Sequence, residues 1–170
     1  MASASELVLR TLDWAHIDFS PPHRQPEWWR LALATVLSVV LCLAADAALV
    51  AVGTTVFPST KGFVHFQFAD YAKLTVIGVL VACAAWPIVT RMCAKPRWLF
   101  FRLAVAVTVV LLLPDAYIWL KGEPAQAVFV LVWMHLAIAL ITYNLLVHVA
   151  PVRTALEGRP GRARTATGAA

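Results

Sequence analysis

The sequence predicts an all-α integral membrane protein, a four-helix bundle with cytoplasmic N- and C-termini. Two features of the composition support this: 61% of the 170 residues are hydrophobic and only 14% are charged. Soluble domains contain roughly 45–50% apolar and about 25% charged residues. The third feature is that the apolar residues form four runs of membrane-spanning length. A globule of this size cannot hide so much apolar surface, which argues against a soluble domain, a disordered chain and a disulfide-rich secreted scaffold.

Residues 1–29 precede the first apolar run and are predicted to form a cytoplasmic segment. Within this segment, SELVLRTLDWAHIDF interleaves apolar with charged side chains. Such a pattern suits a short helix lying on the inner leaflet. A loosely ordered tail is the alternative, and the sequence does not decide between the two. The prolines of Ser20–Pro26 then interrupt any helix.

The four spans are predicted at about 31–53, 71–90, 103–120 and 125–149, within a transmembrane domain of residues 30–150. A helix needs about 20 residues to cross the roughly 30 Å hydrocarbon core. The spans are predicted to be helical because an open strand would leave backbone polar groups unpaired in lipid. The first run is too long for a cleaved signal peptide, whose apolar core has roughly 7–15 residues.

The distribution of Lys and Arg predicts the orientation. Most of these residues precede the first span, surround the 91–102 link or follow the fourth span, and the cytoplasmic side is the one enriched in basic residues. The 54–70 loop and the 121–124 turn therefore face outward, in the inner (plasma) membrane of the cell. The apolar 54–70 loop is expected to cap the bundle. Residues 151–170 are predicted to be a disordered basic cytoplasmic tail.

Five ionisable residues form a candidate polar pocket in the outer half of the bilayer. Ionisable groups within spans are costly and usually face the bundle interior. A bundle can bring groups of similar depth together, and His135 is able to donate to a carboxylate or to titrate near neutral pH. The alternative is structural: Asp70 and Lys73 reach the headgroups, and a bond between His135 and Asp46 fixes helix pairing. The five candidates are Asp46, Asp70, Lys73, Asp115 and His135.

The sequence offers no catalytic residues, metal ligands or cofactor motif that we would assign. His135, Asp46 and Asp115 lack the local spacing of metal ligands. No phosphate-binding or hydrolase motif occurs. The three cysteines form no C-x-x-C pair, which argues against thiol–disulfide chemistry. Because the basic residues flank apolar runs instead of forming one face, we expect no nucleic-acid partner.

Three short segments resemble an uncharacterised actinobacterial family of small four-span integral membrane proteins that carries a domain of unknown function. They are DYAKLTVIG at 70–78, LLPD at 112–115 and WMHL at 133–136, and the resemblance covers roughly residues 31–150. It implies a four-span fold and places emphasis on Lys73, Asp115 and His135. It implies no activity.

The sequence favours a non-enzymatic accessory or scaffold component of the cell envelope, with an outward-facing polar pocket. The chain has no soluble domain, and its longest loop is too short for a separate catalytic site. One alternative is a small homo-oligomeric transporter or channel, in which Asp46 and His135 bind and release a proton or cation. Another is a membrane enzyme acting on a lipid or isoprenoid, with Asp46, Asp115 and His135 as acid–base groups. The expected partners are the lipid bilayer and either a second copy or another membrane protein.

Overall fold

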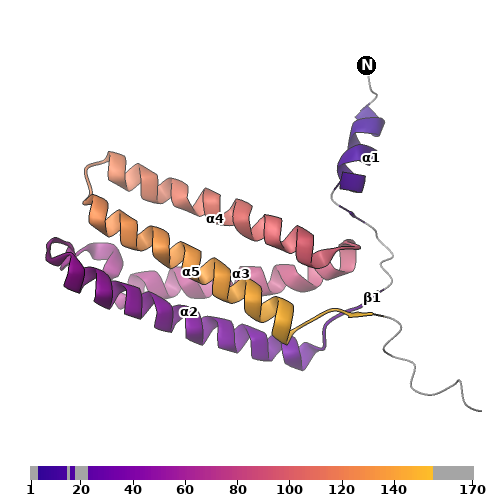
Figure 1. The fold of residues 1–170 in the computed structure, drawn as a ribbon, viewed down its shortest axis with the longest axis horizontal. Helices are drawn as coiled ribbons and strands as arrows, with labels where there is room; N and C mark the ends of the chain where they lie inside the picture. Colours follow the sequence, from indigo (N-terminus) through magenta and orange to yellow (C-terminus); the bar gives the residue numbers. More distant parts are fainter. Residues whose placement is uncertain (1–3, 15, 18–22, 155–170) are drawn as a thin grey trace, which may run out of the picture.

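The structure is a computed structural model that describes residues 4–14, 16–17 and 23–154. Four long apolar helices dominate it and run back and forth along one axis (Figure 1), each long enough to cross a membrane. This confirms the predicted all-α membrane bundle. In chain order the elements are α1 (Ala4–Trp14), β1 (His23–Arg24), α2 (Trp28–Val56), the 3-10 helices η1 (Pro58–Thr60) and η2 (Val64–Phe66), α3 (Phe68–Met92), α4 (Pro96–Leu120), α5 (Ala125–Val149) and β2 (Arg153–Thr154).

Each long helix contains the corresponding predicted span and in three cases extends beyond it. The largest extension is in α4, which begins at Pro96 and not near 103. Proline suits the first turn of a helix because its missing N–H would have no intrahelical partner there. Pro87 and Pro114 lie inside α3 and α4 without ending them. Membrane helices tolerate such prolines because a helix remains the best way to satisfy backbone groups in lipid.

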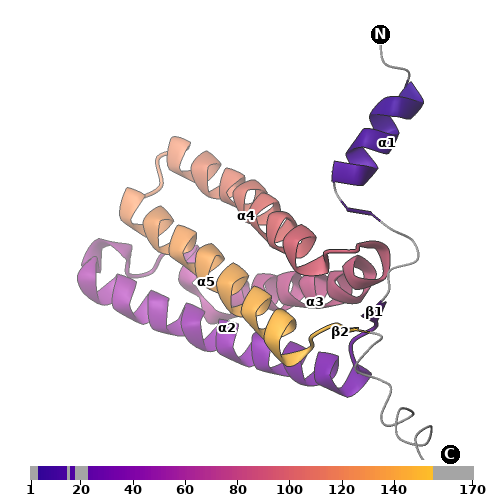
Figure 2. The ribbon, with the colours of Figure 1, turned by 45° about the vertical axis from the view of Figure 1, so that its right-hand side comes forward.

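Helix α5 is the central element of the bundle. It packs against α2, α3 and α4, whereas α4 packs mainly on α5. Figure 2 shows α4 as the outlying helix on one side of α5. Only four α4 residues are buried: Pro96, Phe100, Thr108 and Asp115. The remaining α4 surface is largely apolar and suits contact with lipid.

Two apolar clusters hold the ends of the bundle. At one end, Trp86 and Leu146 are fully buried, and the indole Nε1 of Trp86 donates to the carbonyl oxygen of Ala150 at 2.9 Å. At the other end, Phe66 from the loop between α2 and α3 is buried against a cluster that includes Tyr71 and Met134. The 54–70 loop therefore covers the end of the bundle, because its aromatic side chains contribute to that cluster.

The described parts of the two chain termini meet the α3–α4 link at one end of the bundle. Strands β1 and β2 pair antiparallel, with Arg24 opposite Arg153. Ile17 bridges Cys93, and the N–H of Ala94 donates to the carbonyl oxygen of His16 at 2.9 Å. We call this end the terminal end and the opposite one the loop end. Positive charge predicts that the terminal end is cytoplasmic.

Two sequence expectations concern the segments outside the bundle. Residues 4–14 are helical, which corresponds to the first of the two alternatives for the N-terminal segment. Of the predicted disordered tail at 151–170, Arg153–Thr154 form β2. Residues 155–170 lie outside the described part of the chain.

Gly53 in α2 provides a test of the packing between α2 and α5. A Cβ atom at this position would lie 2.7 Å from Cγ2 of Val130, and a β-branched side chain has little rotamer freedom with which to yield. We expect Gly53→Ala to lower the stability by about 1–3 kcal/mol, measured as thermal unfolding in detergent micelles.

The matched control is Gly78→Ala, because a Cβ there meets nothing within 4 Å. This variant is expected to unfold like the wild type. Combining Gly53→Ala with Val130→Ala is expected to cost less than the sum of the single changes. Strict additivity of the two would contradict the close contact.

Candidate functional site

The five predicted pocket residues occupy different environments. Asp46 in α2 has none of its surface exposed, Asp115 in α4 is 6% exposed, and His135 in α5 is half-buried. Asp70, in the first turn of α3, is half-buried, and Lys73 is exposed. Burial therefore distinguishes Asp46 and Asp115 from the other three residues.

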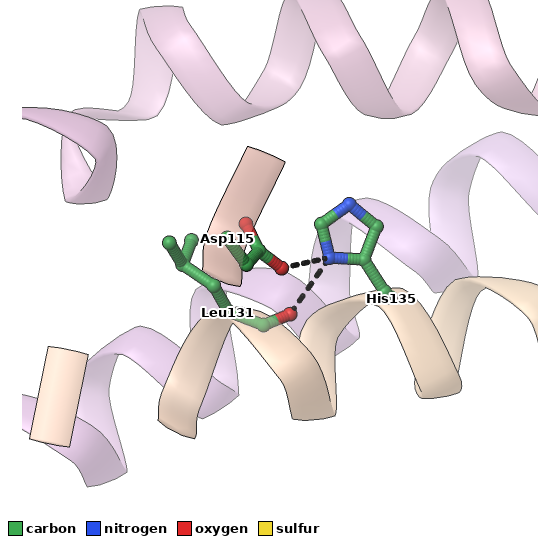
Figure 3. A network of polar contacts seen from close by, with 3 residues as sticks. All are labelled: Asp115, Leu131 and His135. Carbon is green, nitrogen blue, oxygen red and sulfur yellow. Dashed lines mark hydrogen bonds and ion pairs between the residues drawn. The ribbon is translucent and has the colours of Figure 1, made fainter. Parts of the chain in front are cut away.

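Asp115 and His135 form an ion-pair contact between α4 and α5. The Nδ1 atom of His135 lies 3.1 Å from Oδ2 of Asp115 and 3.0 Å from the carbonyl oxygen of Leu131 (Figure 3). A carbonyl oxygen can only accept a hydrogen bond, so this arrangement favours a proton on Nδ1. The other ring nitrogen, Nε2, lies on the far side of the ring from both oxygens. Nε2 is therefore the ring nitrogen that remains available to bind a further group.

One carboxyl oxygen of Asp46 accepts a hydrogen bond, and the other has no hydrogen-bond partner. The hydroxyl of Thr75 in α3 donates to Oδ2 of Asp46 at 2.6 Å. The other carboxyl oxygen, Oδ1, is buried and has no hydrogen-bond partner. A buried polar atom without a partner is costly, and such exceptions in a folded structure call for a specific explanation. Oδ1 therefore marks a position where a proton or a polar ligand would be stabilised.

The two contacts lie on helices that pack together. Asp46 is on α2, which packs against α5, and His135 of α5 contacts Asp115 directly. We refer to Asp46, Asp115 and His135 as the carboxylate–histidine centre. With all three groups ionised, the centre carries one uncompensated negative charge. One further proton makes it neutral, which a low-dielectric interior strongly favours.

A stripe of buried polar residues continues from Asp46 along α2. Ser38, Cys42 and Asp46 follow one another at intervals of four residues and are all fully buried, as expected for one helix face. The Sγ atom of Cys42 lies 3.6 Å from the hydroxyl oxygen of Thr142 in α5. The hydroxyl of Ser38 is buried without a partner. This stripe of polar residues therefore extends from the carboxylate–histidine centre towards the terminal end.

The sequence analysis missed Thr75, Cys42 and Thr142 as neighbours of the centre. A signal for Thr75 was present, because Tyr71, Thr75 and Val79 repeat at the four-residue spacing of one buried helix face. Lys73 lies two residues before Thr75, which places it on a different side of α3. Neither Asp70 nor Lys73 forms an ion pair with another residue of the described chain.

The described residues hold no cluster of three or more His, Cys, Asp and Glu side chains that would suit a metal ion. The centre supplies two carboxylates and one imidazole, but the Nδ1 atom of His135 is engaged by two oxygens. Carboxylates and an imidazole are side chains that can bind and release protons.

Comparison with known proteins gives one match. Residues 22–151 match the model of a family of unknown function (DUF6069). This finding confirms the resemblance to an uncharacterised family. No curated protein and no solved structure matches the chain.

The Asp115–His135 contact predicts an energetic coupling between α4 and α5. We expect Asp115→Asn and His135→Gln to be non-additive by about 0.6–1.7 kcal/mol, the range that double-mutant cycles give for polar contacts between membrane helices. Unfolding of the single and double variants in mixed micelles measures this coupling.

The matched control pair is Asp70→Asn with Lys73→Gln. These two residues make no ion pair with each other or with other described residues, so their effects are expected to add. Additive effects at Asp115 and His135 as well would mean that the contact contributes nothing to helix pairing.

Proposed function

We propose a function from the geometry of the site, because the chain belongs to the DUF6069 family and that family has no assigned activity. The protein is a small proton-linked transport protein of the plasma membrane. Its carboxylate–histidine centre binds a proton from the outer side and releases it again. Binding and release of that proton alternate the centre between a neutral and a negatively charged state.

The observation that supports this proposal is the unpartnered Oδ1 of Asp46. Asp46 is fully buried in a helix that crosses the membrane, and a short side chain at that depth cannot reach water alone. A carboxylate that served only to join two helices would be stabilised by using both oxygens. Here one oxygen is bound by Thr75 and the other is left for a proton.

A proton fits the centre better than a metal cation does. Hard cations such as Ca²⁺ need six to eight oxygen ligands, and the described residues offer no cluster of acidic side chains of that kind. The proton-bearing Nδ1 of His135 also repels a cation beside Asp115. A proton needs only one free carboxylate oxygen.

The depth of the centre favours access from the loop end. Asp115 lies five residues before the end of α4, which corresponds to about 7 Å of helix. Apolar clusters close both ends of the bundle, so a proton that enters at the loop end must pass the cluster at the terminal end to be released inside. If the terminal end is cytoplasmic, as the basic residues predict, the proton enters from outside.

The proposal predicts that Asp46→Asn abolishes proton uptake. The protein is reconstituted into liposomes that contain a pH-sensitive dye, and an inward proton gradient is imposed. We expect wild-type vesicles to acidify at least tenfold faster than Asp46→Asn vesicles, because the amide cannot carry the proton. In infrared difference spectra, the carbonyl band of a protonated carboxylic acid is expected at low pH and is lost in the same variant.

The matched control is Asp70→Asn, which removes a carboxylate near the loop end that is not part of the centre. This variant is expected to acidify at the wild-type rate. The proposal is wrong if wild-type vesicles acidify no faster than protein-free ones, or if Asp46→Asn leaves the rate unchanged.

An accessory role in the cell envelope is the second candidate function, and α4 is the observation that favours it. This helix packs mainly on α5 and leaves most of its apolar side chains exposed. Such a surface suits a helix of a partner membrane protein as well as lipid. The chain then serves to hold that partner, and the centre only fixes the pairing of its own helices.

Native mass spectrometry of the protein extracted gently from its own membrane separates the two functions. A second protein retained at fixed stoichiometry is expected for the accessory role and would identify the partner. A homo-oligomer without another protein is expected for the transport protein. Replacing the exposed Val109 of α4 by Lys should release a bound partner, because a charge in a dry helix interface is costly.

A further inference from the structure

Helix α1 has a polar face and an uncovered apolar face. Glu6, Arg10 and Asp13 lie at spacings of four and three residues and share one side. The apolar side chains of Val8 and Leu12 lie four residues apart on another side of the helix, and Val8 is 55% exposed. A helix with a strong charged face and exposed apolar residues is typical of a segment that lies in a membrane interface.

The structure holds the C-terminal end of α1 at the boundary of the bundle. The ring of Trp14 contacts that of Trp98 edge-on at 5.5 Å. The guanidinium of Arg102 lies 3.9 Å from the centre of the Trp98 ring and 4.9 Å from that of Trp14. The bridge between Ile17 and Cys93 ties the following residues to the α3–α4 link. Because α3 and α4 both end there, α1 lies at the level of the lipid headgroups.

The direction of α1 also indicates that this helix lies at the level of the lipid headgroups. Figure 1 shows that α1 runs across the long axis of the bundle and not along it, and that it projects away from the four spans. In a membrane crossed by α2–α5, a helix with this direction lies close to the membrane plane. Its apolar side chains can then reach the boundary between headgroups and acyl chains.

The charge of the surrounding surface identifies the partner. Exposed basic side chains gather around the α3–α4 link next to α1: Arg91, Lys95, Arg97 and Arg102. Exposed Trp28 and Trp29 stand at the start of α2, at the same end of the bundle. Arg and Lys near a membrane surface attract anionic lipid headgroups, and Trp prefers headgroup depth.

We propose that α1 and the basic residues of the α3–α4 link form a binding surface for anionic phospholipids. Helix α1 lies on the leaflet with Val8 inserted, while Lys95 and Arg97 contact headgroup phosphates. This surface lies at the end of the bundle opposite the loop end and does not use the carboxylate–histidine centre. The inference is therefore independent of the proposed proton transport.

Hydrogen exchange of the full chain in nanodiscs tests the surface. We expect the α1 amides to exchange at least tenfold more slowly in discs that contain phosphatidylglycerol than in discs of phosphatidylcholine alone. Val8→Glu is expected to remove this protection, since it places a charge on the inserted face, while exchange in α2–α5 stays unchanged. Asp13→Asn, on the polar face, is the matched control and is expected to retain the protection.

The double variant Lys95→Gln, Arg97→Gln separates headgroup binding from general insertion, because it leaves the contact of Arg102 with Trp14 and Trp98 intact. It is expected to abolish the difference between the two lipids. Equal exchange of α1 in both lipids of the wild type would overturn the proposal. Protection that depends on protein concentration in lipid-free detergent would also overturn it, because a second copy would then cover α1.

Discussion

The bundle depends on how it accommodates the carboxylate of Asp46 within the membrane. A charge or an unpaired polar group in hydrocarbon is expensive, so the helices must surround this side chain with protein. The hydroxyl of Thr75 donates to one of its oxygens, and no part of the side chain is exposed. Asp46 thereby ties α2 to α3, and α2 also packs against α5. The placement of the remaining span follows from the same centre.

Helix α4 packs mainly on α5, and Asp115 makes its polar contact with that helix. Apolar side chains cover nearly all of its surface and distinguish poorly between lipid and protein. The contact between Asp115 and His135 therefore gives α4 a defined rotation, because only one face of the helix can carry a buried carboxylate to the imidazole. The same ion pair that orients α4 is part of the centre that we propose binds a proton. Structure and proposed function consequently rest on the same three side chains.

The two ends of the bundle have different physical characters. At the loop end, Phe66 and Tyr71 close an aromatic cluster above the centre. At the terminal end, strand pairing joins the two chain termini, and the Trp14–Trp98–Arg102 contacts secure α1. The loop end would serve proton exchange and the terminal end would serve lipid attachment. Neither role would require a soluble domain. A chain of this size can therefore combine both roles in a single bundle.

The sequence by itself determined the class, the number of spans and the chemical nature of the centre. Hydrocarbon tolerates only helices of sufficient length, so apolar runs specify the four spans almost directly. It also singled out Asp46, Asp115 and His135, because ionisable residues are rare within spans. Only the tertiary structure decided that Asp115 meets His135 and that Asp70 and Lys73 form no ion pair within the described chain. The rotation of each helix about its axis decides this, and a nearly uniform apolar surface leaves that rotation open in the sequence. The spacing of Thr75 indicated a buried face of α3, but its contact with Asp46 depends on which face of α3 meets α2.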